Sequence, residues 1–94
     1  MTTETRVALV AVVVSNPDSV EGLNQILHQY SQYIIGRMGI PYGARKVNII
    51  SVAVDAPLEV INALAGKVGK LPGVSTKTAY SDVVTVIEQD QTAD

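Results

Sequence analysis

Two segments constrain this chain most, because Val7–Val14 and Val47–Val54 are apolar at almost every position. The first contains no polar side chain, and the second contains only Asn48 and Ser51. Eight apolar residues are too few to span a bilayer, which takes about 20 residues, so we expect buried strands and no membrane segment. Since successive side chains of a strand point to opposite faces, both strands should be apolar on both faces, as inner strands of a sheet are.

Helical and turn patterns separate these strands. Asn16-Pro17-Asp18-Ser19 provides helix-start chemistry, and a second helix should begin at Asp55-Ala56-Pro57 with Asp55 as its cap. The first helix has an apolar stripe at Val20, Leu23, Leu27, Tyr30 and Ile34, and the second at Leu58, Ile61, Leu64 or Ala65, Val68 and Leu71. Two further strands are expected at Gly36–Tyr42 and Val74–Tyr80, and Val83–Ile87 could add a short strand or helix.

The order strand, helix, strand, strand, helix, strand predicts an α+β, ferredoxin-like βαββαβ sandwich. Its four-stranded antiparallel sheet should carry both helices on one face, which leaves the other face uncovered within 94 residues. Exposed apolar faces of this kind favour association. We therefore expect a homodimer or homotetramer that forms through the open sheet face.

Composition excludes several function classes. The chain has no cysteine, so disulfides and thiolate chemistry are excluded, and we expect a cytoplasmic protein. The net charge of −2 gives no electrostatic reason to bind nucleic acid directly. Residues 37–77 hold six basic side chains against two acids, a local charge of six minus two, or +4. We interpret these basic side chains mainly as part of a solvated surface. The alternative is that they bind a small anionic ligand or an anionic partner.

No arrangement of residues typical of catalysis stands out, so we expect a protein that is not an enzyme and needs no cofactor. His28 is the sole histidine and cannot by itself form a metal site, which usually takes three or four protein ligands. The glycine pairs Gly36/Gly39 and Gly66/Gly69 do not match a phosphate loop. Close packing is the interpretation we favour for them.

Three stretches carry a resemblance to a known family: LNQILHQYSQYIIGRMGIPY (Leu23–Tyr42), VNIISVAVD (Val47–Asp55) and INALAGKVGKLPGVSTKT (Ile61–Thr78). With them the chain resembles the iron-only hydrogenase system regulators, which are small ACT-like proteins. The resemblance implies a ferredoxin-like oligomer with a regulatory role and provides no catalytic residues. It suggests one ACT-like domain at residues 6–80. Residues 81–94 then form a C-terminal extension, partly frayed, that departs from the shorter family pattern.

ACT domains commonly bind small ligands, often amino acids, between protomers near the first strand–helix turn. The resemblance therefore implies an amino-acid-like or anionic ligand near Asn16, Asp18 and Ser19, beside Arg37 and Gly39 of a neighbouring copy. The turn lacks the Pro-Gly pair typical of amino-acid-binding ACT domains, because Asp18 follows Pro17. The leading hypothesis is thus a homo-oligomeric regulatory module that senses a small ligand.

Two alternatives belong to other classes. One is a structural module that binds another protein, without a small ligand, through a sheet edge or the Gly66–Gly73 region. The other is a small ferredoxin-like enzyme whose active site forms between subunits.

Overall fold

The structure of the chain is a computed structural model that describes residues 2–88. Its elements are β1 (Thr2–Val14), the 3-10 turn η1 (Pro17–Ser19), α1 (Val20–Gln29), the 3-10 turn η2 (Ser31–Tyr33), β2 (Ile34–Tyr42), β3 (Val47–Ala56), α2 (Leu58–Gly69) and β4 (Val74–Glu88). No helix in this described part of the chain is both long enough and apolar enough to cross a membrane.

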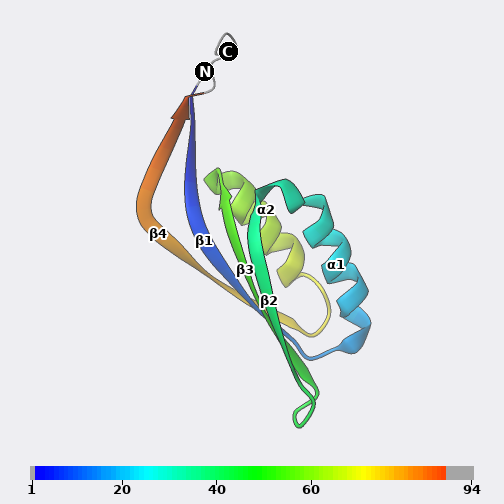
Figure 1. Cartoon of the computed structure of the whole chain (residues 1–94). Coiled ribbons are helices and arrows are strands. Elements are labelled where there is room, and N and C mark those ends of the chain that lie inside the picture. The colour runs from blue at the N-terminus through cyan, green and yellow to red at the C-terminus, as the bar shows by residue number, and fades with distance from the viewer. Residues whose placement is uncertain (1, 89–94) are drawn as a thin grey trace.

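The strands form one antiparallel sheet in the order β2-β3-β1-β4. Both helices pack on the same face of this sheet, and no element within residues 2–88 covers the other face (Figure 1). The two strands that are apolar on both faces, β1 and β3, occupy the middle. The predicted α+β, ferredoxin-like fold is therefore confirmed.

The core lies between the sheet and the helices. Even-numbered residues of β1 and β3 point into it, as the paired Val10 and Val52 show with exposures of 1% and 0%. Odd-numbered neighbours such as Leu9, 45% exposed, point to the face that no helix covers. The helices contribute the buried side chains Leu23, Leu27, Ile61, Leu64 and Val68.

Three predicted details of the helices are wrong. Leu71, which the apolar stripe placed on the second helix, lies beyond the end of α2 at Gly69. Helix α1 ends at Gln29, and Ile34, which the apolar stripe placed on this helix, is the first residue of β2. The chain leaves helical geometry at Tyr30 (φ −104°, ψ 15°), and the β-branched pair Ile34-Ile35 favours a strand. Asp55 does not cap α2 either, because it pairs with Val7 inside the sheet and Pro57 holds the cap position.

Strand β4 is longer than predicted, because Val83–Ile87 continues it instead of forming a separate element. A bulge interrupts the pairing: Ala8 lies opposite Tyr80, whereas Arg6 lies opposite Val84. The Val83 N–H donates to Ser81 Oγ at 3.0 Å, so the bulge keeps this donor satisfied. Beyond it, β1 and β4 form the two-stranded ribbon that extends away from the helices (Figure 1). The frayed tail expected at residues 89–94 lies outside the described residues.

Close packing does not explain two of the four singled-out glycines. A Cβ added at Gly36 or Gly66 would meet no atom within 4 Å, so that prediction is wrong for contacts within the subunit. At Gly69 the added atom would touch Thr76 Oγ1 at 3.4 Å, and at Gly39 it would touch Ile50 at 3.9 Å.

Candidate functional site

A groove lies between α1 and the edge strand β2. One part, of about 260 Å³, is lined by Val20, Asn24, Arg37, Gly39, Ile40, Pro41, Asn48 and Ile50. It continues past Arg37 into a part of about 340 Å³, lined by Asn24, Leu27, His28, Ser31, Ile34 and Arg37. We call these two parts together the α1–β2 groove.

Arg37 lies at the centre of the α1–β2 groove, because it lines both parts. Strand pairing places it opposite Val52, on the helix side of the sheet, where it reaches α1. Its Nη1 donates to Asn24 Oδ1 at 3.2 Å, the one hydrogen bond that the described residues give its side chain. A guanidinium has five N–H donors, so most of them remain for a ligand.

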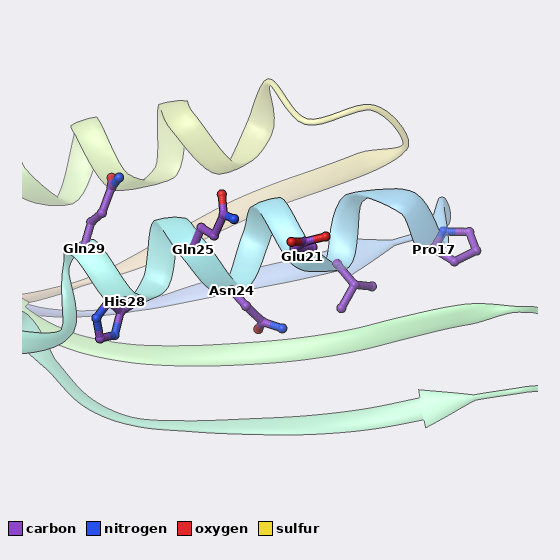
Figure 2. A pocket seen from close by; sticks show the side chains of 7 residues that line it. Pro17, Glu21, Asn24, Gln25, His28 and Gln29 are labelled. Carbon is purple, nitrogen blue, oxygen red and sulfur yellow. The ribbon is translucent and has the colours of Figure 1, made fainter.

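The remaining polar lining is neutral or basic. His28, Ser31 and Asn48 line the groove together with Asn24, and none of its lining residues is acidic. Figure 2 shows Asn24 and His28 on the side of α1 that faces β2 and β3, whereas Gln25 and Gln29 point toward α2. The hollow drawn there has only α1 and Pro17 as its lining, so it is a shallow outer surface of the helix.

Hydrogen bonds hold the turn between β1 and α1 in place, and we call this turn with its bonds the latch. Asn16 Oδ1 accepts the Asp18 N–H at 3.0 Å and caps η1. Ser19 Oγ, on a buried residue, donates to the Pro72 carbonyl at 2.6 Å. The carbonyl of Gly73 accepts from the Ser15 N–H and hydroxyl at 2.8 and 2.9 Å. These bonds join the β1–α1 turn to the α2–β4 turn.

The structure brings together two of the five predicted ligand residues. Arg37 and Gly39 line the groove, whereas Asn16, Asp18 and Ser19 lie at the latch. Asn16 and Ser19 already use side-chain oxygens within the latch, and Asp18 is exposed. Whether a neighbouring copy brings the two groups together stays a prediction.

Asn24 and Asn48 were not predicted as site residues, and His28 was considered only as a metal ligand. The contact between Asn24 and Arg37 was not predicted either. The pairing depends on how α1 crosses the edge of the sheet, and no spacing in the sequence indicates that crossing.

The basic side chains of residues 37–77 do not all lie in the groove. Arg45 and Lys46 belong to the turn between β2 and β3. Lys67 on α2 lies over the Tyr30 ring, 5.1 Å from its centroid, and Lys77 on β4 pairs with Ala11. Within the described part of the chain, no group of three or more potential metal ligands is present.

The sheet order, the two helices on one face and the groove beside the edge strand define a small ferredoxin-like, ACT-like domain. The chain belongs to the family described as "TM1266-like: Iron-only hydrogenase system regulator, putative", whose model matches residues 6–78. That description names a regulator and not an enzyme.

A solved structure supports the same family. The chain is similar to the uncharacterized protein TM1266 from Thermotoga maritima, with 30% identity and a TM-score of 0.78. The similarity covers 81% of this chain and 96% of that one. Among curated proteins, nothing matches the sequence. The last ten described residues, 79–88, lie beyond the family match, and so do Thr2–Thr5, so nearly all of the β1–β4 ribbon is outside it.

Proposed function

We propose that this chain is a cytoplasmic, homo-oligomeric regulatory module that senses a small anionic ligand in the α1–β2 groove. The observation that carries the proposal is Arg37, a guanidinium centred in a groove with no acidic lining residue. The family description supports the regulatory part, and the lack of cysteine supports the location.

The groove suits a carboxylate or phosphate group. Arg37 can donate two parallel hydrogen bonds to such a group, and the bond from Asn24 orients its side chain. Asn48 and Ser31 add neutral partners on either side of Arg37. A ligand whose remaining part is small would be held between α1 and the edge strand.

Thermal unfolding of the full chain tests this proposal with four probes: L-aspartate, L-glutamate, inorganic phosphate and AMP. A ligand at ten times its Kd stabilises the native state by about 1.4 kcal/mol. For a domain of this size that raises Tm by about 5–10 °C. Arg37→Gln should weaken binding, measured by calorimetry, about 10- to 100-fold, because it removes a charged hydrogen-bond donor.

Arg45→Gln is the matched control, since Arg45 lies in the β2–β3 turn and does not line the groove. It should leave the affinity unchanged. If both arginine variants weaken binding equally, the ligand responds to net charge and not to the groove. A panel without any shift in Tm would contradict sensing of these anions and favour the structural module that acts without a ligand.

A further inference from the structure

The sheet face without helices carries many exposed apolar side chains. It contains alternate residues of all four strands, and we call it the open face. Its largest side chains are 39–68% exposed, whereas Ala8, Val10, Val12 and Val14, on the helix side of β1, are buried. These exposed side chains are Val7, Leu9, Val13, Met38, Ile40, Tyr42 and Ile49.

The open face contains both a socket and side chains that can fill one. The socket is a hollow of about 280 Å³ lined almost entirely by apolar atoms, at Leu9, Gly36, Arg37, Met38, Ser51 and Ala53. Gly36 forms part of its floor, and a Cβ placed there would meet nothing within 4 Å. The missing side chain therefore leaves space on the outside of the subunit, where another molecule could enter.

Large and small side chains are separated along the strands. Strand pairing places Gly36, Ala53, Leu9 and Ala79 in one row across the sheet, and three of these four are small. Four residues further along β2, a second row contains Ile40, Ile49, Val13 and Ser75, and three of these four are β-branched and apolar. Between them lies a row of Met38, Ser51, Ala11 and Lys77.

We infer that the open face binds the open face of a second copy, so that the Ile40–Ile49 row of each subunit fills the Gly36 socket of the other. The two subunits would be related by a half turn about an axis that lies between the two sheets, perpendicular to the strands, at the level of Met38 and Ser51. This rotation places the large row of each subunit opposite the small row of the other. Such an isologous contact needs one surface that is complementary to itself. Lys77 lies on the outer strand β4, so its ammonium group can reach water at the rim.

The size of the face agrees with a dimer. Four strands at about 4.8 Å spacing and seven residues at about 3.3 Å rise give about 440 Å² per subunit. Two such flat faces would bury about 900 Å² in total, and protruding side chains add to this area. The value is close to the roughly 1,000 Å² that a specific interface needs. Face-to-face packing at about 10 Å is the usual arrangement of two sheets with apolar inner faces.

This contact is part of the assembly proposed above, and its test needs no ligand. Sedimentation velocity of the full chain at 5–100 μM should give a mass of twice 10.0 kDa, or a larger even multiple. Ile40→Lys and Gly36→Leu should each weaken the contact at least 100-fold, giving a single subunit or half of the parent assembly. The native subunit tolerates both changes, because Ile40 is exposed and nothing lies close to the Gly36 Cβ position.

Gly66→Leu and Val83→Lys are the matched controls. Gly66 also has no atom near its Cβ position but lies on α2, and Val83 is exposed on the β4 bulge. Both should keep the parent mass. A parent chain that is a monomer throughout this range would overturn the inference, as would assembly that survives Ile40→Lys and Gly36→Leu or is lost in Gly66→Leu. Because Arg37 also lines the socket, the mass of Arg37→Gln is measured as well. Loss of ligand affinity at the parent mass then concerns the ligand alone, so failure of one proposal is distinguishable from failure of the other.

Discussion

Replacing Gly73 with alanine should destabilise this domain far more than the size of a methyl group suggests. Gly73 connects α2 to β4 with φ at +69°, in the left-handed region that favours glycine. The added Cβ would lie 2.6 Å from Asn16 Cβ and 3.0 Å from the Asn16 nitrogen. The strained backbone and this contact therefore both oppose the substitution.

The expected loss follows from these two effects. A left-handed conformation costs a residue other than glycine about 1–2 kcal/mol. Relieving the contact with Asn16 moves the turns apart and weakens two hydrogen bonds from Ser15 to the Gly73 carbonyl, each worth about 1 kcal/mol. The sum is about 3–4 kcal/mol, a large share of the 5–15 kcal/mol that stabilises a typical domain.

Urea unfolding followed by far-ultraviolet circular dichroism measures the loss, with both chains at one protein concentration. In thermal unfolding of the same variant, the melting temperature should fall by at least about 12 °C. Gly66→Ala is the matched control, because it adds the same methyl group inside α2 where no atom lies within 4 Å. It should stabilise the native state by about 1 kcal/mol. A loss below about 1 kcal/mol in Gly73→Ala, or an equal loss in both variants, would refute the reasoning.

Two further substitutions test buried polar groups by the same urea unfolding. Thr5→Val should raise the unfolding free energy by about 1 kcal/mol, because Thr5 Oγ1 is buried without a partner among the described residues and valine has the same shape. A clear loss of stability would show that this hydroxyl has a partner after all. Ser19→Ala should lower the unfolding free energy by about 1–2 kcal/mol, since the Pro72 carbonyl loses the 2.6 Å hydrogen bond from Ser19 Oγ. An unchanged value would contradict the role of the latch.

The fold could be predicted because burial has a clear signature in two strands. Val7–Val14 and Val47–Val54 are apolar on both faces, and the sheet places both in its middle. The end of α1 was missed because Ile34 continues the helical spacing, although it begins β2 and pairs with Val54 of β3. The length of β4 was missed because Ser81 and Asp82 interrupt the apolar pattern at a bulge, which the sequence does not distinguish from a loop.

The candidate site could be predicted only in part. Arg37 and Gly39 were selected, and they do line one groove. Asn24 could not be linked to Arg37, because their contact joins a helix and an edge strand whose crossing depends on the whole core. The glycines were misjudged for a related reason. A glycine can indicate close packing, but at Gly36 and Gly66 no atom of the subunit lies within 4 Å of the Cβ position.

The sheet order has a consequence for biosynthesis. Strand β1 leaves the ribosome before the other described elements, yet one of its two neighbours, β4, is synthesised after all of them. Their pairing reaches from Val14–Val74 to Thr2–Glu88, so contacts at the outer end join residues separated by most of the chain. Such long-range pairing slows folding. The nascent chain should therefore hold its most apolar strand half-paired until β4 has been synthesised, which makes this stage its main period of exposure to aggregation and to chaperones.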